Sequence, residues 1–158
     1  MGTPFTRIYD LALIVIRDYR IDNLKNTNLD NFLTYMRGLL TSGMPNFTGN
    51  MQSLEYTSQE ETNEQTNETS TVYYFVNTLS QKEESILAET VVYTWVQVLI
   101  NDVTVFQPHL SIKEFKSMEV SNGIKQRSEY LDKLYEKIQY DIEQYQFSSL
   151  SSLPFWGK

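Results

Sequence analysis

The sequence predicts a mainly α fold: a small helical bundle around a central long helix, with a β-hairpin or finger insertion and an extended C-terminal arm. Three observations predict it: one long apolar segment with a marked helix start, shorter segments of helical periodicity on both sides of it, and a polar tract between two short β-like runs. At 158 residues the chain suits one domain. We expect a single helical domain over residues 1–146, with the insertion at about 46–78, and the arm at 147–158.

The central helix is expected at residues 80–106. Ser80 and Glu83 have the spacing of a capping box, in which each side chain hydrogen-bonds the other residue's backbone N–H. Apolar residues then recur at helical spacing and leave little polar surface: Ile86, Leu87, Val91, Trp95, Val98, Leu99 and Val103. The competing interpretation is a strand through residues 91–100, because Val, Ile, Tyr and Trp favour strands. The capping box and the length favour the helix.

A first helix is expected at about residues 4–19. Thr3 and Pro4 suit an N-cap and a first turn, and apolar residues follow at helical spacing: Phe5, Ile8, Ala12, Val15, Ile16 and Tyr19. Leu11, Leu13 and Ile14 fall outside that stripe, so this helix either lies deep in the fold or packs on another subunit. A polar link at 22–28 follows it.

A second, amphipathic helix begins after Thr27 or Asn28, either of which can serve as the N-cap. One face is apolar and suits a core: Leu29, Phe32, Leu33, Met36, Leu39 and Leu40. Gly43 is expected to end the helix as a left-handed C-cap, and Pro45 prevents its continuation.

The insertion is predicted to form two short strands, at 54–56 and 72–76, which flank a tract without apolar side chains. Such a tract buries too little surface to offset its ordering entropy alone. We therefore expect a hairpin or finger with a projecting acidic tip, which carries Glu60, Glu61, Glu64 and Glu68. The alternative for an isolated monomer is a solvated flexible loop.

A short helix is expected at about 112–119, because Ser111 and Glu114 repeat the capping-box spacing. Asn122 and Gly123 are expected to break the chain before a last helix at about 124–145. That helix has an apolar face and, opposite it, charges of mixed sign, which is typical of a solvated face or of complementary subunit contacts.

Residues 147–158 are not expected to continue this helix, because several Ser residues and Pro154 oppose it. The segment nevertheless carries large apolar side chains: Phe147, Leu150, Leu153, Phe155 and Trp156. Burial of each would contribute roughly 1.5–3 kcal/mol. We therefore expect a docked arm, folded on its own domain or inserted into a neighbour, with these residues binding the partner.

The composition argues against an enzyme. There are no cysteines, His109 is the single histidine, and the 6 glycines form no phosphate-binding loop. We expect no catalytic, cofactor-binding or metal-binding residues. The net charge of −7 disfavours a nucleic-acid-binding surface, and no apolar run is long enough to span a membrane.

Three segments carry a family resemblance: IYDLALIVIRDYRID, YFVNTLSQKEESILAETVVYTWV and IKEFKSMEVSNGIKQRSEYLDKLYEKI. In this order they resemble the head–tail connector (adaptor or neck) proteins of tailed bacteriophages. The resemblance implies a homo-oligomeric ring, commonly a dodecamer, below the portal protein and above the next neck or tail ring. DNA would pass through its channel without sequence-specific binding. The protein would be made in the host cytoplasm and reside in the neck of the virion.

Two other classes remain open from the residues alone. One is another virion component, such as a tail-completion or head-associated protein. The other is a small cytoplasmic binding or regulatory module whose finger contacts a partner. The 11 Tyr, 8 Phe and 2 Trp exceed what one core of this size encloses comfortably, which favours a chain with interfaces.

Overall fold

A computed structural model describes residues 2–62, 69–106 and 114–150. Within them the fold is mainly helical, with a two-stranded antiparallel sheet, as predicted. The elements in chain order are α1 (Phe5–Val15), α2 (Tyr19–Thr27), α3 (Leu29–Gly43), a 3₁₀ turn (Met44–Asn46), β1 (Tyr56–Thr62), β2 (Thr69–Phe75), α4 (Gln81–Phe106) and α5 (Glu114–Leu150).

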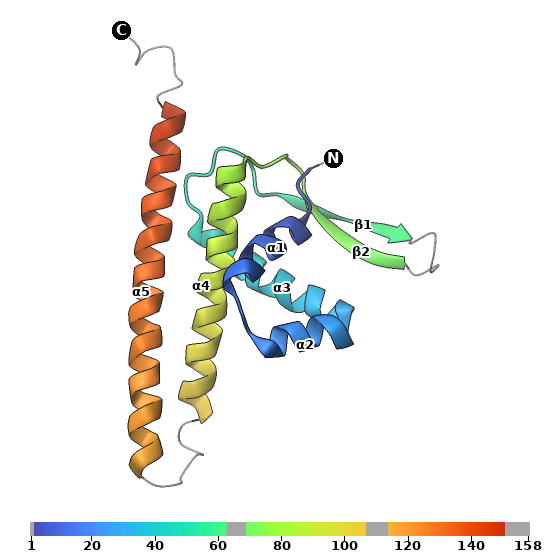
Figure 1. Ribbon diagram of the computed structural model, residues 1–158. Helices are drawn as coiled ribbons and strands as arrows, with labels where there is room; N and C mark the ends of the chain where they lie inside the picture. Colours follow the sequence, from blue (N-terminus) through green and yellow to red (C-terminus); the bar gives the residue numbers. More distant parts are fainter. Residues whose placement is uncertain (1, 63–68, 107–113, 151–158) are drawn as a thin grey trace.

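Helix α4 is the centre of the bundle, and α1, α3 and α5 pack on it (Figure 1). The capping box forms as predicted: the Ser80 N–H donates to Glu83 Oε2 at 2.7 Å, and the Glu83 N–H donates to Ser80 Oγ at 3.3 Å. Apolar side chains on several sides of the helix are buried, among them Ile86, Leu87, Val91, Val92 and Val96. The helix is confirmed and the alternative strand at 91–100 is wrong.

The predicted helix at 4–19 is too long, because α1 ends at Val15 and a new helix starts at Tyr19. The Asp18 side chain accepts a hydrogen bond from the Arg20 N–H at 2.9 Å and caps α2. The predicted polar link at 22–28 is therefore largely helical. Its polar side chains face outward, and Ile21 is the only residue of α2 that is fully buried.

Helix α3 is confirmed, with Asn28 Oδ1 accepting from the Asn31 N–H at 2.9 Å. The prediction that Gly43 is a left-handed C-cap is wrong, because its φ is −81°. A Cβ on Gly43 would lie 2.9 Å from the Thr90 carbonyl oxygen of α4. Glycine is needed there for the close approach of two helices. Gly49, and not Gly43, has a left-handed backbone conformation, with φ 69°.

The β-hairpin is confirmed, but its strands are longer than the predicted 54–56 and 72–76. The register runs from Tyr56 opposite Phe75 to Thr62 opposite Thr69, so much of the polar tract is itself strand. Cross-strand polar pairs replace apolar burial there, as in the contact between the hydroxyls of Thr62 and Thr69 at 3.1 Å. The hairpin projects from the bundle on the side opposite α5 (Figure 1).

Aromatic rings fix the base of the hairpin on α1. The Phe5 ring centroid lies 4.6 Å from that of Phe75, 5.2 Å from that of Tyr56 and 6.0 Å from that of Tyr73. This places the hairpin face that carries these three residues against the bundle. It also gives the otherwise exposed strands a buried anchor.

Thr3 is not the N-cap that its position suggested. Its carbonyl oxygen accepts from the Phe75 N–H at 2.9 Å, and its N–H donates to the Asn77 carbonyl at 3.2 Å. Its hydroxyl accepts from the Leu79 N–H at 2.8 Å, just before α4. Pro4, opposite Tyr74, ends this short stretch of pairing with β2. The N-terminal segment therefore joins the hairpin to the start of α4.

Helix α5 is continuous, so the predicted separate helix at 112–119 and the break at Asn122 and Gly123 are wrong. A single glycine in a helix interior costs only about 1 kcal/mol, which an otherwise helical pattern overcomes. The proposed capping residue Ser111 lies outside the described residues. Helix α5 runs antiparallel to α4 along its length (Figure 1).

The predicted start of the arm at residue 147 is also wrong, because α5 continues to Leu150. The Ser148 hydroxyl donates to the Tyr145 carbonyl at 2.7 Å, so this serine bonds within the helix instead of ending it.

Candidate functional site

The predicted partner-binding residues are only partly described. Phe147 lies in the last turns of α5 with 66% of its surface exposed, so this ring does not dock on its own domain. Leu150 is the last residue of α5. Its side chain, like Leu153, Phe155 and Trp156, lies outside what the structure describes.

The acidic finger is likewise partly described. Glu60 and Glu61 are adjacent on β1, exposed, and point to opposite faces of the hairpin. The Glu61 carboxylate accepts a hydrogen bond from the Tyr74 hydroxyl, which raises the pKa of that hydroxyl. Glu64 and Glu68 lie outside the described residues.

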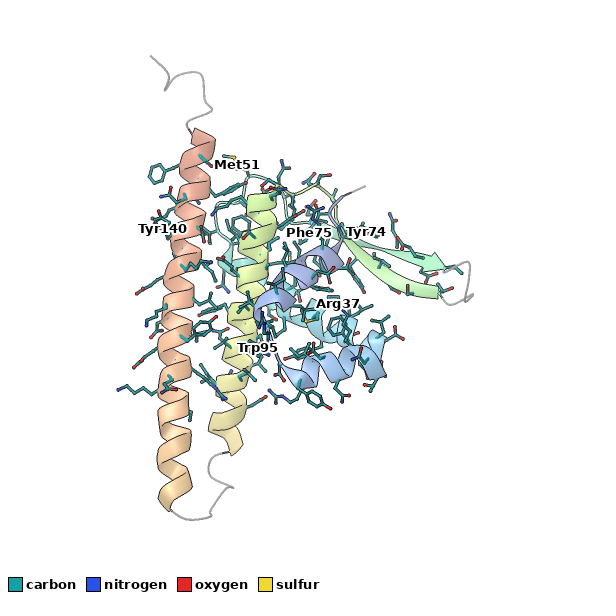
Figure 2. All side chains as sticks on the ribbon, viewed as in Figure 1. Arg37, Met51, Tyr74, Phe75, Trp95 and Tyr140 are labelled. Carbon is teal, nitrogen blue, oxygen red and sulfur yellow. The ribbon has the colours of Figure 1, made fainter. Side chains whose placement is uncertain are left out.

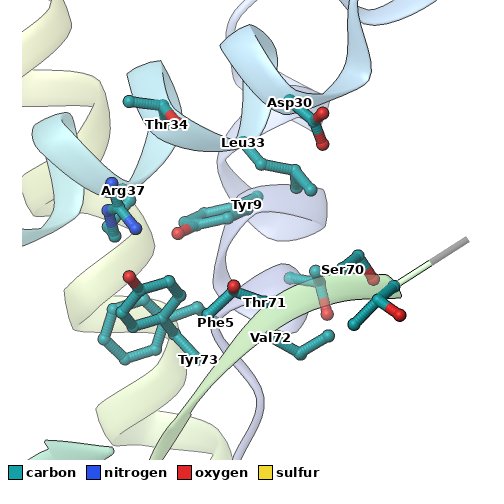
Figure 3. A pocket seen from close by; sticks show the side chains of 12 residues that line it. Phe5, Tyr9, Asp30, Leu33, Thr34, Arg37, Ser70, Thr71, Val72 and Tyr73 are labelled. Carbon is teal, nitrogen blue, oxygen red and sulfur yellow. The ribbon is translucent and has the colours of Figure 1, made fainter. Parts of the chain in front are cut away.

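A pocket of about 310 Å³ lies between α1, α3 and β2 (Figure 3). Its walls are Phe5 and Tyr9 from α1, Leu33, Thr34 and Arg37 from α3, and residues 69–73 of β2, with Asp30 at the rim. The pocket is bordered by β2 and by no described residue of β1, so it opens along the outer edge of the sheet.

Arg37 is the cation of this pocket. Its guanidinium carbon lies 4.4 Å from the centroid of the Tyr73 ring, a cation–π contact. Within the described part of the chain, no carboxylate lies within 4.0 Å of it. Burial raises the pKa of the neighbouring Tyr9 hydroxyl, and the positive charge of Arg37 opposes that rise. The pocket thus offers a half-buried positive charge beside several hydroxyl groups, which suits a carboxylate.

A second, more open hollow of about 460 Å³ lies between the turn from α1 to α2 and the α4–α5 pair. Trp95 and Leu99 of α4 line it, together with Arg17, Arg20 and Arg127. Figure 2 places Trp95 on α4, near the start of α2. Arg20 is held by Asp18 at 2.9 Å, so part of this positive charge is already neutralised.

Among the exposed large apolar side chains, two groups lie on separate surfaces. One is the junction of α1 and α2, where Ile14 is 68% and Tyr19 is 81% exposed, with Val15 between them. The other is the outer face of α5, where Tyr140 points away from α4 (Figure 2) and Phe147 lies two helical turns further on. Exposed aromatic residues in such groups are typical of interfaces.

Two carboxylates in the first turn of α4, Glu83 and Glu84, are buried. The sequence indicated only the capping role of Glu83. Glu84 pairs with the Arg7 guanidinium at 2.8 Å. Glu83 Oε1 accepts from the Tyr145 hydroxyl at 2.6 Å, and that hydroxyl accepts from the Met51 N–H at 3.1 Å. These bonds connect α4 to α1, to α5 and to the segment before β1, so their role is structural.

The pocket residues Tyr9 and Arg37 were also missed. Neither belongs to a motif, and the pocket exists because β2 lies beside α1 and α3, which periodicity does not reveal. Among the described residues, no group of acidic or histidine side chains is arranged to hold a metal ion. No described helix has both the length and the apolar character needed to cross a bilayer.

Comparison of the chain with protein-family models, with curated protein sequences and with solved structures found no match.

Proposed function

We propose that this chain is a structural virion protein of a tailed phage: a head–tail connector that assembles as a ring below the portal protein. The ring would join the head to the next neck or tail ring and leave a channel for DNA. The family resemblance of the three sequence segments supports the proposal. The observation that carries it structurally is the presence of exposed apolar side chains on two unlike surfaces of one small subunit.

Two unlike surfaces are what a ring requires. In a closed ring each subunit contacts its neighbours head to tail, so one surface meets a different surface of the next copy. The α1–α2 junction with Ile14 and Tyr19 and the outer face of α5 with Tyr140 are such a pair. A two-fold dimer would need only one self-complementary surface.

The charge also supports a channel that DNA passes without being retained. Retention by a protein depends on Lys and Arg that neutralise phosphates and release counterions. This chain has 13 basic and 20 acidic residues and a net charge of −7. The described end of the hairpin carries the exposed carboxylates Glu60 and Glu61.

The mass of the purified full chain in solution tests the proposal. Light scattering after size-exclusion chromatography should give a closed multimer, commonly a dodecamer in the family that the chain resembles, and electron microscopy should show a ring. A stable monomer that is absent from virions would overturn it. A chain found elsewhere in the particle would make it another virion component.

Paired surface variants test the observation that carries the proposal. Ile14→Ser combined with Tyr19→Ser should reduce the multimer to smaller species and leave the helical content unchanged. The matched control is Leu29→Ser, which changes an exposed apolar residue at the start of α3, outside both surfaces. Equal loss of assembly in both variants would contradict the assignment of the α1–α2 junction.

A further inference from the structure

The outer edge of β2 is only partly paired. Val76 donates to the Glu55 carbonyl on the β1 side, while Phe75 donates to Thr3 on the outer side. Because backbone groups alternate along a strand, the N–H and C=O groups of Tyr73, Thr71 and Thr69 also point outward. The N-terminal segment covers this edge only as far as Tyr74. In the described part of the chain, no backbone bond from residues 69–72 leaves the hairpin.

The pocket beside Arg37 lies along this free edge. Residues 69–73 of β2 form one of its walls, and α3 lies across from them (Figure 3). A strand added to the edge would therefore run past Arg37 and Tyr9. Its side chains on the bundle-facing side would enter a pocket of about 310 Å³.

The chain itself has a strand that suits this place. In β1, Ser58 lies opposite Tyr73 and Glu60 lies opposite Thr71, so both share the hairpin face that packs on Phe5. The outer edge of β1 is exposed along all of its residues, Tyr56–Thr62. Glu60 is in no ion pair with another described residue, and Arg37 has no carboxylate partner among them.

We propose that β1 of a second copy pairs with the outer edge of β2, which places Glu60 of that copy at the Arg37 pocket. Hairpins in the same orientation would then alternate β1, β2, β1, β2 in one antiparallel sheet, and each new strand would keep its bundle-facing side chains on the same face. The contact is head to tail. The inference rests on the proposed ring and names one of the contacts that would close it.

Charge reversal tests this pairing. Arg37→Glu would face Glu60 of the next copy, and Glu60→Arg would face its Arg37, so each variant alone should assemble at least about tenfold more weakly than the wild type. The double variant should recover assembly. An equimolar mixture of the two single variants should also recover it, because alternating copies place opposite charges at every contact. If Arg37 had a purely structural role, mixing the two single variants would not restore assembly.

The neighbouring acidic residue provides the matched control. Glu61→Arg makes the same charge change one residue away, on the opposite face of the hairpin, and should leave assembly unchanged. Thr71→Pro is a second test, because it removes an outward N–H that β1 does not use and should block strand addition while the hairpin stays paired. Melting curves of every variant check that the bundle still folds.

The outcomes separate this inference from the proposed function. A wild-type chain that forms rings while Arg37→Glu, Glu60→Arg and Thr71→Pro assemble normally would overturn the edge pairing and leave the ring intact. Failure of mixing to rescue the single variants would also overturn it. A stable wild-type monomer that is absent from virions would overturn both.

Discussion

Single residues decide how closely the helices of this bundle approach, and Gly43 is the clearest case. A Cβ at this position would lie 2.9 Å from the carbonyl oxygen of Thr90 and 3.0 Å from the hydroxyl of Thr94. The first neighbour is backbone and cannot rotate away, so α3 and α4 would have to separate.

Gly43→Ala should therefore lower the free energy of unfolding by about 1–3 kcal/mol, the usual range for overpacking. Urea denaturation measures it. Gly38→Ala is the control on the same helix, because a Cβ there meets nothing within 4 Å, and it should stabilise by about 0.5–1 kcal/mol. Similar effects of the two substitutions would show that the helix contact is not tight.

The hydroxyl of Tyr145 connects the Met51 N–H to Oε1 of the Glu83 carboxylate, whose Oε2 accepts from the Ser80 N–H. Burial by itself raises the pKa of Glu83, but the hydrogen bonds from Tyr145 and Ser80 outweigh it, so the pKa lies below its ordinary value of 4.5. The pKa of Tyr145 is raised to about 12 by burial and by this carboxylate.

Tyr145→Phe should cost about 1–3 kcal/mol at neutral pH. A carboxyl whose pKa is lowered on folding contributes stability that is complete above its unfolded pKa and is lost as the pH falls through its folded pKa. The difference between variant and wild type should therefore shrink as the pH falls below 4.5. Denaturation at several pH values measures it, with the exposed Tyr140→Phe as the control. A difference independent of pH would contradict the role of Glu83.

At the scale of elements, α5 shows that a glycine does not by itself end a helix. A Cβ on Gly123 would meet nothing within 4 Å, and Gly123 is not among the glycines with positive φ. Gly123→Ala should therefore stabilise the protein by about 0.5–1 kcal/mol, because it restricts the unfolded chain and favours the helix. A rise in melting temperature would agree with a continuous helix. A fall would support a turn at this position.

The helices that pack on α4 were predictable because their signals are local. The capping box at Ser80 and Glu83 and the apolar stripe of α3 depend on neighbours along the chain. The end of α1 was not predictable, because Ile16 is buried and continues the helical spacing. Only the cap at Asp18 marks the start of the new helix. The true extent of the hairpin was missed because its strands gain from pairing and not from apolar burial.

The candidate site depends on contacts that no local pattern encodes. Arg37 of α3 and Tyr73 of β2 are far apart in sequence but in contact in the fold. Glu60 lies on the bundle-facing side of the hairpin only because the register places it opposite Thr71. The sequence did identify Glu60, Glu61 and Phe147 as candidates, the first two in a projecting tip and Phe147 in a docked arm, and all three are exposed.

At the scale of the whole molecule, the end of α5 should serve assembly more than folding. Deletion of residues 147–158 removes exposed Phe147 and leaves Tyr145 in place. The shortened chain should keep its helical content, apart from the last turn of α5, and assemble more weakly. Circular dichroism and light scattering measure the two effects, with deletion of 151–158 alone as a comparison. A general loss of helix would show that the arm belongs to its own core.

The hydrogen bonds of Thr3 have a mechanical consequence. They join β2 to Leu79, the residue before Ser80, through the backbone and the hydroxyl of Thr3. A force applied to the hairpin would therefore be transmitted to the start of α4, where Glu84 also binds Arg7 of α1.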